Sequence, residues 1–185
     1  MQVENVSVFG GEYGIDTDKS APGWPIMLLN SYFEGQRKSA ILTNEGGLTI
    51  VRMKVKNVPV AVEIKEDAPD RLFMEDCIFE NVKRTGLILT DAGNAATQIN
   101  LRGIQCKNVP VFSLERSTNE QVSGKGKTYQ ITRFTYGFNA NSLEDIPQIV
   151  REAEIVPIKS IISLDAGDTP MLPTMNHWVN IRDLG

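Results

Sequence analysis

Apolar and polar positions alternate with a period of two through the first 116 residues, and the alternation recurs in units. Each unit carries one glycine or asparagine at an equivalent place, and successive members lie 22 to 27 residues apart. These residues are Gly11, Gly35, Asn57, Asn81 and Asn108. A period of two predicts strands, and a repeat of this length predicts an array in which each unit packs on its neighbours.

Other columns follow the same register. Two residues before the glycine or asparagine stand Phe9, Phe33, Val55, Phe79 and Cys106, and seven before it stand Leu28, Ile50, Met74 and Leu101. A third column, four residues before the glycine or asparagine, contains Ser31, Met53, Cys77 and Ile104. It lies three residues after the column of Leu28, an odd spacing that would put the two columns on opposite sides of a straight strand. A bend is therefore expected between them, so that both columns face inward. Glycine tolerates positive φ, and asparagine does so better than most residues, so the marker column predicts a second corner.

Short strands that repeat in register and stack predict an all-β fold, a parallel β-helix of about five coils, plus a less regular C-terminal segment. Neighbouring coils would lie about 4.8 Å apart. One column, Gly10, Glu34, Lys56, Glu80 and Lys107, alternates in charge from coil to coil. This column is interpreted as a solvated ladder that fixes the register. A charged groove for an ionic polymer is the alternative.

The chain divides into three parts. Residues 1–116 form the coils. Residues 117–164 hold an exposed loop, a strand or strand pair at 128–138 and a possible short helix within 142–156 that closes the β-helix. Residues 165–185 read as a proline-rich linker and the start of a further domain.

Composition narrows the chemistry. The chain has 185 residues and a net charge of −4, which argues against a general nucleic-acid binder. No apolar stretch is long enough to span a membrane. Two cysteines, Cys77 and Cys106, and one histidine, His177, exclude a Cys/His zinc site, and no cofactor is predicted. The two cysteines fall in neighbouring coils at positions two columns apart, so buried free thiols are expected rather than a disulfide.

The repeat, together with the segment Trp178-Val179-Asn180-Ile181-Arg182-Asp183-Leu184-Gly185, resembles the pectate-lyase-like right-handed β-helix superfamily, in particular glycoside-hydrolase-28-related proteins. The resemblance implies a right-handed helix, action on polysaccharides by hydrolysis or β-elimination, and binding along an outer sheet face. It also implies a polysaccharide or glycan partner, a following β-helix domain, and a secreted, periplasmic or cell-surface location. The catalytic motif of polygalacturonases (N-T-D, D-D, G-H-G and R-x-K) is absent.

Candidate site residues follow from the spacing of acids. Glycoside hydrolysis uses two carboxyls about 5–5.5 Å or roughly 6.5–9.5 Å apart, and Asp76 and Glu80 in one coil are the catalytic candidates. Asn30 and Arg52 share a column with Asp76, so the three could hold a sugar acid. The structural alternative is a surface ion pair between Asp76 and Arg52.

A second candidate lies in a loop after the first coil. Asp16, Asp18 and Trp24 have the make-up of a sugar-binding platform, and the alternative is that Trp24 covers the open end of the coils. The adjacent acids Glu75 and Asp76 offer too few oxygen ligands for Ca²⁺, so no metal site is predicted.

The sequence therefore predicts a module of a secreted carbohydrate-active β-helix protein. It would act on or bind a polysaccharide and would not be catalytic alone. The alternatives are a non-catalytic glycan-binding β-helix, a structural scaffold and a rigid stalk.

Overall fold

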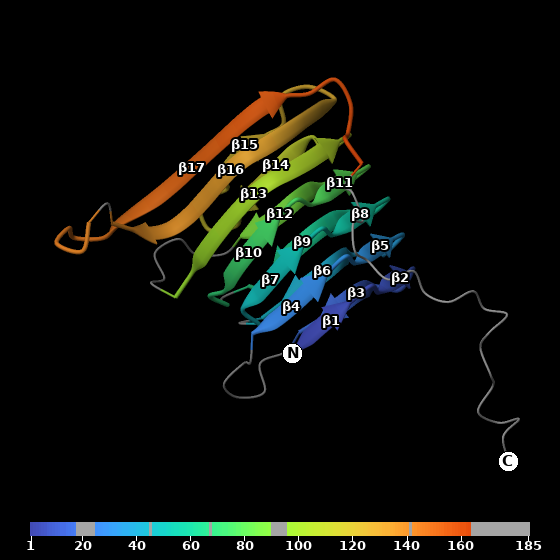
Figure 1. Ribbon diagram of the computed structural model, residues 1–185, viewed down its shortest axis with the longest axis horizontal. Helices are drawn as coiled ribbons and strands as arrows, with labels where there is room; N and C mark the ends of the chain where they lie inside the picture. The colour runs from blue at the N-terminus through green and yellow to red at the C-terminus, as the bar shows by residue number, and fades with distance from the viewer. Residues whose placement is uncertain (18–24, 45, 67, 90–95, 141, 164–185) are drawn as a thin grey trace, which may run out of the picture.

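The computed structural model describes residues 1–17, 25–44, 46–66, 68–89, 96–140 and 142–163 (Figure 1). Within these ranges the chain forms an all-β parallel β-solenoid of about four turns, without a helix. The predicted fold class is confirmed. The predicted linker at 165–185 and His177 lie outside the described residues.

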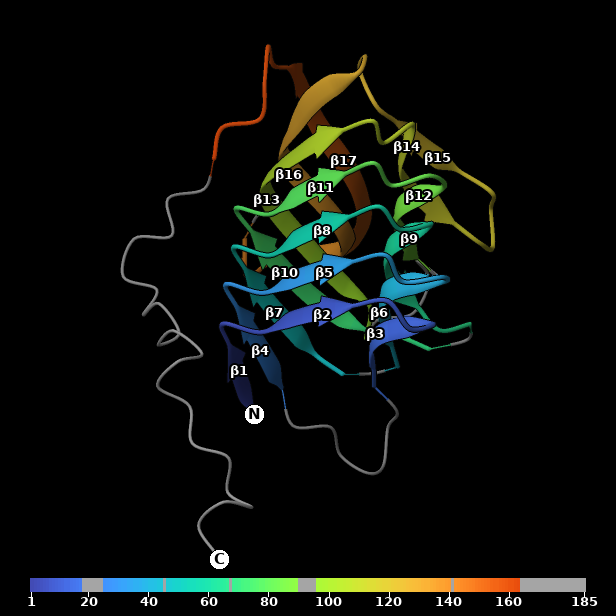
Figure 2. The ribbon, with the colours of Figure 1, turned by 90° about the vertical axis from the view of Figure 1, so that its right-hand side faces the viewer.

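The solenoid has three faces, each built from parallel strands stacked along its axis (Figures 1 and 2). The first face contains β1 (Gln2–Glu4), β4 (Ile26–Leu29), β7 (Leu48–Val51), β10 (Arg71–Glu75) and the start of β13 (Gln98–Lys107). The second face contains β2 (Ser7–Phe9), β5 (Tyr32–Glu34), β8 (Lys54–Lys56), β11 (Ile78–Glu80) and the end of β13. The third face contains β3 (Tyr13–Asp16), β6 (Ser39–Thr43), β9 (Val60–Ile64), β12 (Thr85–Leu89) and β14 (Val111–Glu115).

The core is made of the predicted apolar columns. Phe33, Val55, Phe79 and Cys106 pair across neighbouring strands of the second face and are fully buried. Leu28, Ile50, Met74 and Leu101 do the same on the first face. Cys77 and Cys106 are buried free thiols, as predicted, and burial raises the pKa of each to about 12.

The first coil is displaced by one residue from the predicted register. Phe9 pairs with Glu34, and Gly10, with φ of 68°, occupies the corner where Gly11 was expected. Val8 therefore points into the core, and Phe9 is 68% exposed. The two consecutive glycines made both registers possible in the sequence. The earlier corner at Asn5, which follows β1 in register with β4, selects the observed one.

Beyond the parallel strands the chain reverses. β16 (Thr128–Asn139) runs antiparallel along the whole of β13, and β17 (Gln148–Pro157) runs antiparallel to β16 (Figure 1). Of the two alternatives predicted at 128–138, a strand or a strand pair, the structure has the single strand. The short helix predicted within 142–156 is wrong, because backbone pairing with β16 along ten residues of β17 overrides the local helix propensity of its Glu, Ala and Arg residues.

The exposed loop predicted after residue 116 contains a short strand. β15 (Gln121–Ser123) folds back antiparallel on β14 and ends the third face. The first two faces are thus extended by the β16–β17 pair, whereas the third face ends in the β14–β15 hairpin. After β17 the chain returns to β13, where the side-chain amide of Gln105 accepts from the Ile162 N–H at 2.7 Å and donates to its carbonyl at 3.1 Å.

Candidate functional site

The structure places Asp76 and Glu80 at opposite ends of a short segment of one coil. Asp76 occupies the corner between β10 and β11 with φ of 51°, and Glu80 is the last residue of β11. The corner also holds Asn30 and Arg52, and Arg52 Nε donates to Asn30 Oδ1 at 2.6 Å. The described residues contain no ion pair between Arg52 and Asp76. Asn30, Arg52 and Asp76 therefore occupy the same corner in three successive coils, and the side chains of Arg52 and Asn30 bind each other.

Glu80 is held by lysines. Its carboxylate lies 3.1 Å from Lys107 Nζ and 3.7 Å from Lys54 Nζ. Burial by itself raises the pKa of Glu80, but the hydrogen bond and charge of Lys107, with the charges of Lys54 and Lys56, outweigh it and lower the pKa. A general acid needs the opposite shift, so Glu80 stays ionised and serves the predicted charge ladder.

An amide ladder, formed by Asn57, Asn81 and Asn108, runs beside these charges at the next corner. Asn108 donates to Asn81 at 2.7 Å, Asn81 donates to Asn57 at 3.0 Å, and Asn57 donates to the Glu34 carboxylate at 2.7 Å. Tyr32 donates its hydroxyl to the other oxygen of Glu34 at 2.5 Å. Tyr32 and Asn57 lower the pKa of Glu34, so this acid is also ionised, with both oxygens occupied.

The second predicted candidate is only partly described. Asp16 ends β3 and forms an ion pair with Lys65 at 3.2 Å. Asp18 and Trp24 lie outside the described residues. The structure therefore does not test the predicted sugar platform.

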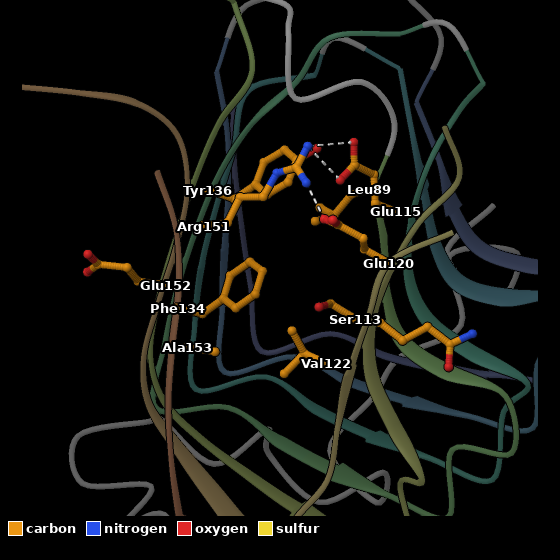
Figure 3. A pocket seen from close by; sticks show the side chains of 11 residues that line it. Leu89, Ser113, Glu115, Glu120, Val122, Phe134, Tyr136, Arg151, Glu152 and Ala153 are labelled. Atoms are coloured by element: carbon orange, nitrogen blue, oxygen red, sulfur yellow. Dashed lines mark hydrogen bonds and ion pairs between the residues drawn. The ribbon is translucent and has the colours of Figure 1, made fainter. Parts of the chain in front are cut away.

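The sequence did not predict the end pocket, a cavity of about 300 Å³ where the third face stops and the β16–β17 pair continues (Figure 3). Its walls come from β12, from the β14–β15 hairpin and from β16 and β17. The residues that line it are Leu89, Ser113, Glu115, Glu120, Gln121, Val122, Phe134, Tyr136, Arg151, Glu152 and Ala153.

Arg151 of β17 bridges two carboxylates at the mouth of the end pocket (Figure 3). Its Nη2 lies 3.1 Å from Glu115 Oε2, and its Nη1 donates to Glu120. The side chain of Glu115 is only 3% exposed, and Ser117 Oγ donates to its other oxygen at 2.8 Å. A carboxylate this buried is stable only with such partners, so Arg151 fixes the β17 strand to the end of β14.

The opposite wall is aromatic. Phe134 and Tyr136 point from β16 toward the cavity and are almost fully buried (Figure 3). The Arg151 guanidinium lies 5.7 Å from the centre of the Tyr136 ring, and Phe134 packs edge-on against Phe112 at 5.5 Å. The end pocket thus combines carboxylates at its mouth with apolar and aromatic surface inside, which is the usual composition of a small-ligand site.

The end pocket could not be predicted from the sequence because its polar residues belong to no repeat. Tyr136 pairs with Arg151 and Phe134 pairs with Ala153 across β16 and β17. Those pairs become visible in the sequence only if 148–157 is assigned as a strand, and the helix prediction concealed them.

No family model matches the chain, and the comparison with curated proteins finds no match. The part of the chain that the structure describes contains no helix with the length and apolar character needed to cross a membrane. The same residues hold no cluster of three or more His, Cys, Asp or Glu side chains suited to a metal ion. The fold therefore defines the class of the protein as a parallel β-solenoid.

Proposed function

We propose that this protein is a non-catalytic module that binds a polysaccharide or glycan, in a secreted or cell-surface protein of the pectate-lyase-like type. The observation that carries the proposal is the end pocket, where the carboxylates of Glu115 and Glu120 face the aromatic side chains of Phe134 and Tyr136. Sugars present hydroxyl groups and apolar C–H faces together, and such a pocket offers partners for both.

Binding is favoured over cleavage by the state of the acids. Cleavage by the usual glycosidase mechanism needs one carboxyl that donates a proton and one that is free to act on water or on the sugar. Glu115 and Glu120 both engage Arg151, which lies between them. On the coils, lysines hold Glu80, and Tyr32 and Asn57 hold Glu34. Each of these carboxylates thus binds a neighbouring side chain of the protein.

A structural scaffold is the second candidate, and the outer surface of the second face favours it. The amide ladder and the Glu80 ion pairs connect neighbouring coils and satisfy one another. If the protein is a scaffold, the hydrogen bonds and ion pairs between coils serve to keep the fold rigid, and the end pocket binds no ligand.

The test is electrophoresis of the folded protein through gels that contain neutral or acidic polysaccharides, with mass spectrometry of any released oligosaccharide. Retardation without release is expected. Ala153→Trp, on the exposed strand β17 opposite Phe134, should fill the end pocket and abolish retardation. Arg133→Gln is the matched control, because Arg133 lies on the same strand pair and forms ion pairs with Glu152 and Glu154.

Each alternative gives a different result. Released products would contradict the non-catalytic role. Retardation that Ala153→Trp leaves unchanged would move binding away from the end pocket. No retardation by any polysaccharide would overturn the binding function and leave the scaffold.

A further inference from the structure

We infer that the end pocket accepts uncharged sugar residues and rejects uronic acids, an inference that rests on the proposed function. Three observations carry it: the balance of charge at the mouth, the engagement of Arg151, and the direction in which the neighbouring cations point.

The charge facing the cavity is negative. Glu115 and Glu120 lie at the mouth and Arg151 lies between them, so two carboxylates oppose one guanidinium (Figure 3). The carboxylate of Glu152 points away from the cavity in the same view, and its ion pair with Arg133 is 3.0 Å long. A ligand carboxylate would add a third negative charge to a partly buried site, where like charges repel more strongly than in water.

Arg151 does not offer its usual carboxylate-binding geometry to a ligand. Arginine recognises a carboxylate best when two parallel N–H groups reach its two oxygens. In this structure Nη1 of Arg151 donates to Glu120, and Nη2 faces Glu115 at 3.1 and 3.4 Å. An acidic sugar would have to displace one of these glutamates, and displacing Glu115 would leave a buried carboxylate without its cation.

Other arginines near the site face elsewhere. Arg133 forms its ion pairs with Glu152 and Glu154, at 3.0 and 3.2 Å. Arg116 follows Glu115 in the chain and binds Glu63 and the carbonyl of Ile64 on the third face. Among the described residues that line the end pocket, Arg151 is the one cation.

An uncharged sugar avoids this conflict and meets suitable partners. Its hydroxyls can donate to the carboxylate oxygens of Glu120, and the hydroxyl of Ser113 also lines the cavity. Val122, with the small exposed parts of Phe134 and Leu89, lines the cavity with apolar surface that the C–H groups of the ring can contact. The volume of about 300 Å³ lies at the lower end of the roughly 300–1,000 Å³ found for ligand pockets, so a short part of a glycan fills it.

The test compares two α-1,4-linked tetrasaccharides that differ only at C6, the tetramer of galactose and tetragalacturonate, by titration calorimetry and saturation-transfer NMR. We expect the dissociation constant of the acid to be at least tenfold higher than that of the neutral sugar at low ionic strength. The difference should shrink at about 0.5 M salt, because salt screens the repulsion at the mouth. Other neutral tetrasaccharides, of glucose and mannose, are included in case galactose has the wrong stereochemistry.

Glu120→Gln tests the cause, because Glu120 is exposed and its amide isostere keeps the fold while removing one negative charge. In this variant the ratio of the dissociation constants of the acidic and the neutral sugar should be at least threefold smaller than in the wild type. Glu12→Gln is the control, because it makes the same change at an exposed glutamate of the first coil that pairs with Lys38, and it should leave the preference unchanged. Ala153→Trp should abolish binding of every sugar.

The outcomes distinguish failure of this inference from failure of the proposed glycan-binding function. Tighter binding of tetragalacturonate that Ala153→Trp abolishes would overturn the inference and leave the proposed function intact. Binding of none of the sugars would overturn both. A preference for the neutral sugar that Glu120→Gln does not alter would overturn the electrostatic explanation.

Discussion

Single residues help to keep the coils in register. Asn81 contributes to stability in two ways, through its backbone conformation and through its side-chain hydrogen bonds. Its backbone has φ of 54°, and its side chain connects Asn57 with Asn108. A non-glycine residue without a local hydrogen bond pays roughly 1–2 kcal/mol for this conformation, and each ladder bond contributes about 0.5–1.5 kcal/mol.

Replacement of Asn81 can separate the two contributions. Asn81→Ala loses both the amide bonds and the tolerance of positive φ, and we expect the free energy of unfolding to fall by about 2–3 kcal/mol. Asn81→Gly keeps the backbone tolerance and should be about 1 kcal/mol more stable than the alanine variant. Urea denaturation of the two variants measures the difference. Equal stability would show that the corner imposes no conformational cost.

Glu80 makes the stability of the fold depend on pH. Lysines hold the folded pKa of Glu80 below its usual 4.5, so its contribution to stability is complete above that value and is lost as the pH falls through the folded pKa. The free energy of unfolding should therefore decline below about pH 4.5, and Glu80→Gln should decline less steeply.

Denaturation of Glu80→Gln between pH 7 and pH 2.5 measures this slope. The control is Glu66→Gln, which changes an exposed glutamate outside the strands. If Glu80→Gln and the wild type lose stability in parallel, the lysines do not stabilise the ionised form.

At the scale of elements, β17 is a long edge strand with little burial. It pairs only with β16, its residues are mostly exposed, and Ile149 and Val156 are 45% and 40% exposed. The strands β7 and β10 pair on both sides and bury their inward residues. Local opening costs least where few apolar contacts are lost.

Hydrogen exchange should therefore be fastest in β17 among the long strands. We expect its amides to exchange at least tenfold faster than those of β10 in the folded protein, as measured by mass spectrometry of peptic peptides. A saturating neutral sugar should slow exchange in β17, because Arg151 and Ala153 line the end pocket. Protection of β17 equal to that of β10 would contradict the edge-strand explanation.

Elements also show what could be predicted from the sequence. The repeat placed the strands of the later coils correctly, because each inward column is apolar in every coil and the register is fixed by several columns at once. The first coil was displaced by one residue because Gly10 and Gly11 both suit the corner. β17 was missed because its pairing with β16 connects segments with no shared pattern, and the end pocket was missed with it.

For the molecule as a whole, the stacked core makes each coil depend on its neighbours. Phe79 is fully buried between Val55 and Cys106, and Phe73 of the preceding strand points outward. Large-to-small changes of buried aromatics cost about 3–5 kcal/mol.

Phe79→Ala should therefore lower the free energy of unfolding by about 3–5 kcal/mol, whereas Phe73→Ala should lower it by less than about 1 kcal/mol. Guanidinium unfolding followed by far-ultraviolet circular dichroism and by tyrosine fluorescence measures both. The two signals should coincide in the wild type. If they separate, the solenoid unfolds in sections, and neighbouring coils are less tightly coupled than the continuous core suggests.

The amide ladder also gives the stack a direction. Each asparagine donates toward the coil before it, and the series ends at the carboxylate of Glu34, which can only accept. Extra coils copied from the one that contains Asn81 can therefore be inserted in the middle, since each brings one donor and one acceptor in the same orientation. The coil with Glu34 cannot be duplicated there, because it would interrupt the series. A designer who lengthens this protein has a repeating unit to multiply and a terminal unit to keep.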